Sequence, residues 1–150
     1  GADGWRVLQE RGADLVVNYK TEDVAEQVKA FTGGKGVNVW YETQPPTDLD
    51  RTLALTAQLG RVVVMAGRKA RPVLPSGDLY VKGITLYGFA ILYYPPGPQR
   101  AALDQVGAWL ADKKLRAVVG KVFPLSEAAA AHRLQEENTL GKAGTLTGKV

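Results

Sequence analysis

The sequence contains no cysteine and a single histidine, and this shortage restricts its metal chemistry. Disulfides and thiolate metal sites are excluded, and a catalytic zinc ion takes about three protein ligands from cysteine, histidine and carboxylate side chains. The one histidine, His132, lies in the helical stretch AAAAHRLQEE, where we interpret it as a packing residue. We therefore expect no metal ion, zinc included, on this chain. The absence of cysteine agrees with a reducing, cytoplasmic location.

Long apolar runs are also missing, because no stretch approaches the roughly 20 apolar residues that span a bilayer. We therefore expect no membrane association. The net charge is +4, but the basic residues are scattered, and only the stretch 68–71 (RKAR) is dense. A dispersed surplus of this kind is typical of a solvated surface, so nucleic acid is not the expected partner.

The two ends lack the features of natural termini. The chain starts at Gly1 without a methionine or a signal peptide, and residues 146–150 are typical of a strand that is cut short. We therefore expect the chain to be a fragment of a longer protein, without catalytic activity of its own.

Segments with helix and strand patterns alternate along the sequence. Helices are expected at 4–11, 22–31, 48–58, 99–110 and 126–137, and strands at 14–19, 37–41, 61–67, 84–91, 118–123 and 146–150, with a loop at 68–77. Asp3, Thr21 and Ser126 are expected helix N-caps, and Gly60 an expected helix stop. The apolar residues that recur at helical spacing, and that we expect to face inward, are Val24, Val28, Phe31, Leu49, Leu53, Ala57, Leu103, Val106 and Leu110. Strands separated by helices of about ten residues predict right-handed crossovers and a parallel sheet, so the expected fold class is α/β.

Ligands of open parallel sheets bind at the carboxyl ends of the strands. The first such end lies within the stretch GADLVVNYKTED, where Tyr19 can hydrogen-bond and stack, and Lys20 supplies positive charge for a phosphate. The other ends to consider are 43–45 (TQP), 66–68 (AGR) and 89–91 (FAI). A purely structural interpretation also stays open for these residues, as solvated strand ends, turn glycines or core aromatics.

Four stretches of the sequence, in this order and spacing, resemble one family. They are GADLVVNYKTEDVAEQVKAFTGGKGVNVWYET, LGRVVVMAGR, YVKGITLYGFAIL and GKVFPLSEAAAAHRLQEENTLGKAGTLTGKV. The chain resembles the zinc-independent quinone oxidoreductase (zeta-crystallin-like) branch of the medium-chain dehydrogenase/reductase superfamily, over the C-terminal half of a whole member. The resemblance implies a partial Rossmann-like nucleotide-binding domain over residues 1–114, with a parallel sheet flanked by helices. It also implies that residues 115–150 return to the catalytic domain.

The resemblance implies an NADPH-binding crevice. Tyr19 takes the position beside the adenosine 2′-phosphate, residues 65–68 approach the ribose and the nicotinamide, and residues 89–91 bind the carboxamide. The implied cofactor-binding residues are Tyr19, Thr43, Met65, Ala66, Gly67, Arg68, Phe89, Ala90 and Ile91. The catalytic residues are not identified.

Two departures from the family pattern bear on the cofactor. The glycine-rich turn that holds the pyrophosphate is absent. Residues 33–36 (GGKG) do not replace it, because they follow a helix and precede a strand, so we interpret them as a helix stop. The lysine that many members carry near Gly4 is missing, and Trp5 and Arg6 follow instead, so NADH remains an alternative to NADPH.

The implied function is hydride transfer from the nicotinamide to a small-molecule quinone or enone-type carbonyl, in a parent enzyme that forms a homodimer through the strand at 85–91. Four tyrosines are candidate pocket residues, although aromatic packing is the favoured role of each: Tyr80, Tyr87, Tyr93 and Tyr94. Two alternatives stay open. One is a non-catalytic module that binds nucleotide or nucleic acid, and the other is an enoyl-reductase unit of a larger synthase.

Overall fold

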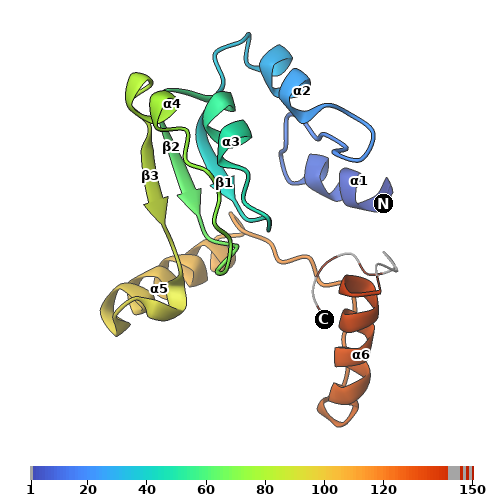
Figure 1. Cartoon of the computed structure of the whole chain (residues 1–150). Coiled ribbons are helices and arrows are strands. Elements are labelled where there is room, and N and C mark those ends of the chain that lie inside the picture. The colour runs from blue at the N-terminus through green and yellow to red at the C-terminus, as the bar shows by residue number, and fades with distance from the viewer. Residues whose placement is uncertain (1, 142–145, 147, 149) are drawn as a thin grey trace. The chain divides into compact units, whose positions relative to one another are not determined.

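A computed structural model describes residues 2–141, 146, 148 and 150 of the chain (Figure 1). Its contacts divide the chain into two units, one made of residues 17–94 and the other of residues 1–16 together with 95–150. The implied division into domains at residues 114 and 115 follows a different criterion and stays a prediction.

Residues 17–94 contain a three-stranded parallel sheet. Its strands are β1 (Val37–Glu42), β2 (Thr56–Val64) and β3 (Thr85–Gly88), and they lie side by side in that order (Figure 1). Their β-branched and aromatic residues have the β propensity from which the strands were expected. The α/β class with a parallel sheet is confirmed.

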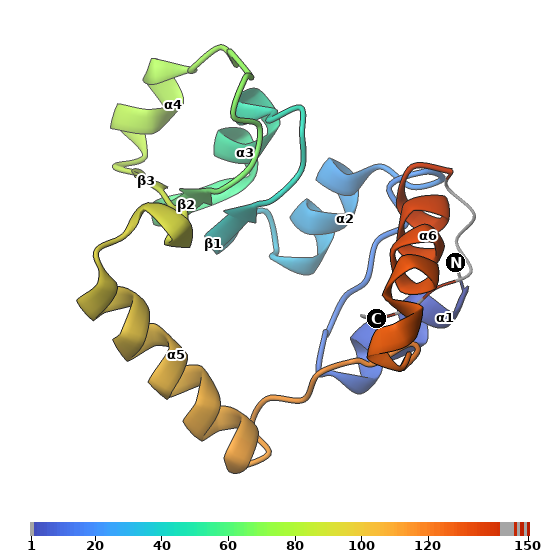
Figure 2. The ribbon, with the colours of Figure 1, turned by 90° about the horizontal axis from the view of Figure 1, so that it is seen from below.

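Two helices, α3 (Leu49–Leu55) and α4 (Ser76–Val81), lie on the same face of the sheet (Figure 2). The core of the unit lies between these helices and the strands. Its buried residues are Leu53, Val62 and Ile84, and the partly buried residues packed against them are Trp40, Val64 and Leu79. Val39 and Tyr41 alternate with Trp40 along β1 and are exposed on the other face of the sheet.

The junction of α3 and β2 differs from the expectation. The expected helix over 48–58 is wrong, because β2 begins at Thr56, directly after α3, and contains Ala57. Leu59 has a left-handed backbone (φ 57°), and a Cβ on Gly60 would overlap the Cγ2 of Thr56. Gly60 therefore permits a sharp bend inside β2, a bulge that the helical spacing of the apolar residues did not indicate.

Residues 14–19 do not form the expected strand. The described ladders pair β1 with β2 and β2 with β3, and neither of them includes residues 14–19. Asn18 instead anchors a turn, and its backbone oxygen accepts from Thr21 N at 2.9 Å and Glu22 N at 2.8 Å.

The helix α2 (Val24–Phe31) follows this turn and contacts α3. Its N-cap is Asp23, whose Oδ1 accepts hydrogen bonds from Ala25 N at 2.7 Å and Glu26 N at 3.1 Å. The expected cap, Thr21, lies outside the helix because Asp23 satisfies the first backbone donors. Val24 and Val28 are partly buried as expected, whereas Phe31 is exposed.

An Asp23→Ala variant is expected to lose about 1 kcal/mol of unfolding free energy, because two backbone donors lose their acceptor. Thr21→Ala is the matched control and should leave the stability unchanged. Thermal or urea unfolding monitored by circular dichroism measures both. A larger loss for Thr21→Ala than for Asp23→Ala would show that the cap has been assigned to the wrong residue.

The segment between β2 and β3 contains a helix that the sequence did not indicate. Residues 68–75 form the expected loop, but α4 begins at Ser76 and includes Gly77. Proline and glycine around its start favour a loop by composition, while Leu79 packs on the core and holds the short helix in place. β3 is also shorter than expected, because the 3₁₀ turn η1 (Ile91–Tyr93) follows it.

The other unit contains α1 (Ala2–Glu10), α5 (Pro96–Ala111), the 3₁₀ turn η2 (Leu125–Glu127) and α6 (Ala128–Thr139). Asp3 lies within α1 and Ser126 within η2, so neither is an N-cap, and Glu127 precedes α6 without a side-chain cap bond.

Two further expectations fail in this unit. Residues 118–123 form no strand beyond an isolated bridge at Val119. The residues of α5 that were expected to face inward are exposed: Leu103, Val106 and Leu110. Of the expected strand at 146–150, residues 147 and 149 lie outside the described residues, and residues 146, 148 and 150 are not part of a strand. Within the described part of the chain, no helix combines the length and the apolar character that crossing a bilayer requires.

Candidate functional site

The carboxyl ends of the three strands lie at one edge of the sheet, because all three run parallel. The hydrogen bonds between neighbouring strands continue for one residue beyond the ends of β2 and β3. Met65 N donates to the backbone oxygen of Glu42 at 3.1 Å, and Phe89 N donates to that of Val64 at 3.0 Å. The loops that follow β2 and β3 therefore start from fixed positions.

A cavity of about 510 Å³ opens between these two loops. Its lining residues are Val64, Met65, Ala66, Gly67, Arg68, Phe89, Ala90 and Tyr93. Six of the nine residues that the sequence analysis names for the cofactor are among them: Met65, Ala66, Gly67, Arg68, Phe89 and Ala90. The structure thus brings together two expected strand ends from distant parts of the sequence. Their role in cofactor binding stays a prediction.

The cavity combines aromatic surface with one positive charge. The ring of Phe89 lies 5.6 Å from that of Tyr94, at an interplanar angle of 53°. The turn η1, closed by a 2.9 Å bond from Tyr93 N to Ala90 O, brings Tyr93 to the lining. Arg68 is the only charged side chain among the described residues that line the cavity. Aromatic walls beside a guanidinium suit a flat ligand that carries negative charge.

Gly67 lies in the turn that follows β2 and is one of the residues that line the cavity. Its φ is +78°, and a Cβ there would lie 2.9 Å from the Oγ1 of Thr47 and 3.1 Å from the Cβ of Ala70. Its oxygen accepts from Ala70 N at 2.7 Å, which closes the turn. A side chain at this position would be strained and would displace its neighbours. A second hollow, of about 340 Å³, adjoins the first and shares Val64, Ala66 and Gly67 with it.

The other three expected residues lie outside the cavity lining. Tyr19 is 76% exposed on the turn that Asn18 anchors, while Thr43 and Ile91 are also exposed and are not part of the lining. Val64 lines the cavity but was not singled out, because the last residue of an apolar strand carries no special sequence signal.

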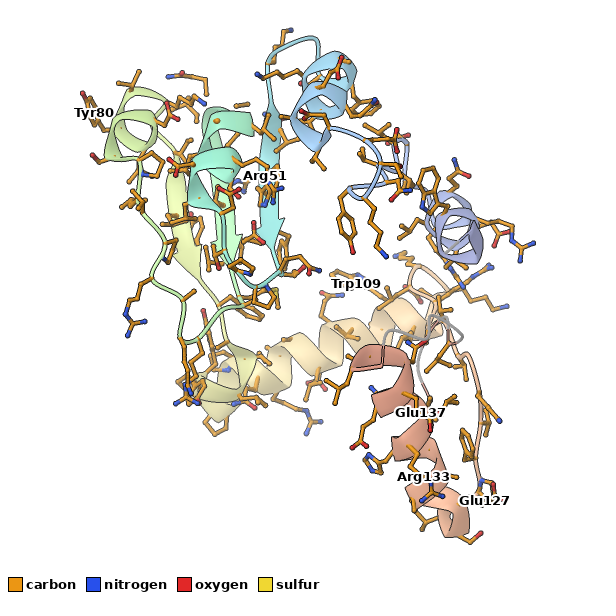
Figure 3. The ribbon with its side chains drawn as sticks, turned by 45° about the vertical axis from the view of Figure 1, so that its right-hand side comes forward. Arg51, Tyr80, Trp109, Glu127, Arg133 and Glu137 are labelled. Atoms are coloured by element: carbon orange, nitrogen blue, oxygen red, sulfur yellow. The ribbon has the colours of Figure 1, made fainter. Side chains whose placement is uncertain are left out.

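The four candidate tyrosines fall in different places. Tyr93 lines the cavity and Tyr87 the adjoining hollow, whereas Tyr94 packs against the ring of Phe89. Tyr80 projects outward from α4 and is 77% exposed (Figure 3). Tyr80 lines none of the hollows that this section describes.

A larger hollow of about 720 Å³ lies at the opposite, amino edge of the sheet. Residues 34–36 border it, and Gly34 N donates to Lys29 O at 2.8 Å, so this glycine stretch ends α2. The Nζ of Lys82 donates to Leu53 O at 2.8 Å and Ala54 O at 2.9 Å. The helix ends at this edge present carbonyl oxygens, which favour cations over phosphates. The interpretation of residues 33–36 as a helix stop is confirmed.

The side chains that could bind a metal ion are not grouped together in the described part of the chain. Among the described residues, no group of three or more histidine, cysteine, aspartate or glutamate side chains could hold one. His132 lies on α6 and lines a small hollow with mostly apolar neighbours, including Leu125 and Ala128. The described residues of this chain therefore do not fit a zinc site.

Comparison with known proteins identifies similar sequences and folds. A family model described as zinc-binding dehydrogenase matches residues 11–143. A 2-haloacrylate reductase from a Burkholderia species is 34% identical over 128 residues, which cover 81% of this chain and 38% of that protein. A quinone oxidoreductase from Sus scrofa is 30% identical over 135 residues, or 87% of this chain and 39% of that protein.

The same architecture occurs in a crystal structure of Escherichia coli quinone oxidoreductase complexed with NADPH. The two superpose with a TM-score of 0.71 at 22% identity, over 99% of this chain and 46% of that one, which shows a shared fold. The chain thus spans about two fifths of the length of the curated relatives described above.

Proposed function

Since this chain belongs to the zinc-binding dehydrogenases of the medium-chain dehydrogenase/reductase superfamily, we propose that the protein carrying it is an NADPH-dependent reductase. In this proposal it transfers hydride to a small-molecule quinone or enone-type carbonyl. The observation that carries the proposal is the cavity at the carboxyl edge of the sheet. Its aromatic wall and its guanidinium suit a reduced dinucleotide there.

The residues of this chain would bind and orient the cofactor. The Arg68 guanidinium would pair with an anionic group of the ligand, and the side chains of Phe89 and Tyr93 would exclude water from the nicotinamide end. When bound, the reduced nicotinamide supplies the hydride. Tyr19, Thr43 and Ile91 belong to the proposed set through the family resemblance, since they lie outside the cavity lining.

The choice of acceptor follows from the relatives' names and the apolar surface of the site. A quinone oxidoreductase and a 2-haloacrylate reductase both act, by their names, on small molecules, and both are at least 30% identical to this chain. A reductase is favoured over a non-catalytic binding module, because the relatives described above are named as a reductase and an oxidoreductase. The enoyl-reductase unit of a larger synthase remains the second candidate, and the sequence that flanks this chain would separate it from a free-standing enzyme.

The proposal has four further parts. The enzyme works without zinc, its division into domains falls near residue 114, two copies form a homodimer through β3, and it resides in the cytoplasm. The poor metal donor set supports the first part. The fully exposed burial pattern of β3 supports the third, and the absence of cysteine supports the last.

An Arg68→Gln variant of the polypeptide that carries this chain is expected to bind NADPH about tenfold more weakly, the effect of one lost charge-assisted hydrogen bond. Lys69→Gln is the matched control, because Lys69 is the neighbouring cation and does not line the cavity. Quenching of protein fluorescence by NADPH and by NADH measures both affinities. Equal losses in the two variants would mean that only the general positive field matters, and no binding by the unmodified protein would contradict the proposed function.

A further inference from the structure

Glu42, the last residue of β1, is a buried carboxylate that the proposed function has not used. It is only 4% exposed, and both of its oxygens accept hydrogen bonds. Oε2 accepts from Trp40 Nε1 at 3.2 Å and from Thr52 Oγ1 at 3.0 Å, and Oε1 accepts from Gln44 N at 3.1 Å. The three donors come from β1, from α3 and from the loop between them.

The backbone of the same residue reaches the second loop of the site. Its oxygen accepts from Met65 N, the first residue after β2, at 3.1 Å. The two loops also touch directly, because the hydroxyl of buried Thr47 lies against Gly67, where a Cβ would be 2.9 Å from it. Glu42 therefore stands at the junction of residues 43–48 and residues 65–70.

Stability alone does not explain a carboxylate at this position. Its partners are neutral donors, and no ion pair links it to a lysine or arginine in the part of the chain that the structure describes. Burying a carboxylate without a cation is costly, and an apolar side chain of similar size often does as well or better. A carboxylate does offer two fixed acceptors that an apolar residue lacks, and here they fix the geometry of two loops.

We propose that Glu42 is a positioning residue that holds residues 43–48 and 65–70 in the arrangement that receives the dinucleotide. This inference rests on the proposed function, because those loops carry Thr43 and residues 65–68. Glu42 need not touch the cofactor, and it acts through the loops that do.

Glu42→Gln is the informative substitution. Glutamine keeps the size of the side chain but replaces one acceptor oxygen with an NH₂ group, which is a donor. Whichever way the amide is turned, that group faces a donor, either the backbone N–H of Gln44 or the indole N–H of Trp40. One hydrogen bond of the junction is therefore lost, while the packing is retained.

The first measurement needs no ligand. In the polypeptide that carries this chain, amide hydrogen exchange of Glu42→Gln should become at least about fivefold faster in residues 43–48 and 65–70, the effect of one lost hydrogen bond. Ile84→Val is the control, since it trims the buried core without touching either loop. Exchange that rises equally across the sheet in both variants would overturn the proposal, because it would show a general loss of stability only.

The second measurement uses NADPH. Glu42→Gln should weaken its affinity about fivefold, while kcat at saturating NADPH stays within about twofold of the unmodified protein. Each variant is measured at a temperature that lies equally far below its own Tm. Under this condition Ile84→Val should leave the affinity for NADPH unchanged. An affinity unchanged in Glu42→Gln would overturn the positioning role. An unmodified protein that binds neither NADPH nor NADH would instead contradict the proposed function, and the exchange data would still decide whether Glu42 holds the two loops.

Discussion

A Gly67→Val variant is expected to lose about a hundredfold in affinity for NADPH, or close to 2.8 kcal/mol of binding free energy. The loss follows from the backbone at the turn after β2. Gly67 has a φ of +78°, a region that β-branched residues rarely occupy. Holding an ordinary residue there costs about 1–3 kcal/mol, so the turn would relax to another conformation.

The relaxed turn would no longer present its neighbours to the cavity. A Cβ at Gly67 meets the hydroxyl of Thr47 on one side and the Cβ of Ala70 on the other, at 2.9 and 3.1 Å. Relief of these contacts moves residues 65–70 away from residues 43–48. Arg68, the adjacent residue, would then lie away from the cavity that it now lines. The loss should therefore exceed that of Arg68→Gln, which removes one interaction and leaves the turn intact.

Two comparison variants separate the turn from the general effect of a larger side chain. Gly67→Ala should fall between the unmodified protein and Gly67→Val. Gly77→Ala introduces the same methyl group in α4, where nothing lies within 4 Å of it, and should leave NADPH affinity unchanged. Fluorescence titration gives all four values. Tight binding by Gly67→Val would refute both the turn's role and the placement of the cofactor beside it.

A Leu53→Ala variant is expected to lose about 2–5 kcal/mol of unfolding free energy, the range for large-to-small changes in a closed core. Leu53 is 0% exposed and lies between α3 and the sheet, with Val62 and Ile84 as its buried neighbours. Its truncation leaves a cavity in the core between the helices and the strands. Since small proteins are stable by about 5–15 kcal/mol in total, the fraction unfolded at 37 °C should rise visibly.

Leu92→Ala is the matched control for this prediction. Leu92 lies on the 3₁₀ turn η1 and is 85% exposed, so the same substitution removes no packed contact. Its effect should stay within about 0.5 kcal/mol. Urea denaturation provides the comparison, with the slope of the transition checked for two-state behaviour. Equal midpoints for the two variants would show that α3 does not form the core as described.

Strands could be predicted from the sequence where the composition of the segment itself favours a buried strand. The runs VNVWY and RVVV have the β-branched and aromatic composition of buried strands, and both form strands of the sheet. Residues 14–19 have a similar composition but no paired neighbour, and pairing is a non-local property that composition does not contain. The end of α3 was missed for a related reason, because β2 pairs with β1 from Thr56 onward, and the helical spacing of residues 48–58 does not contain that pairing.

The candidate site was predictable to the extent that it depends on topology. Residues 65–68 and 89–90 directly follow strands, and parallel strands bring their ends to one edge, so these residues meet as expected. Tyr19 does not join them, because its place depended on the strand at 14–19. The role of Glu42 could not be read from the sequence, since its donors include Thr52, whose position relative to β1 is set by tertiary packing.

The order of the three strands has a practical consequence. Each outer strand, β1 and β3, is paired on one side only within the described residues. The run VNVWY in β1 carries no charge and no proline, which are two of the devices that keep an open edge from pairing with another chain. A preparation of these 150 residues is therefore expected to associate through this edge, because the unpaired backbone groups of an outer strand can pair with a second copy. Its loss from solution should depend steeply on concentration, and a lysine at Val39, which is exposed on the far face of β1, should slow that loss without disturbing the core.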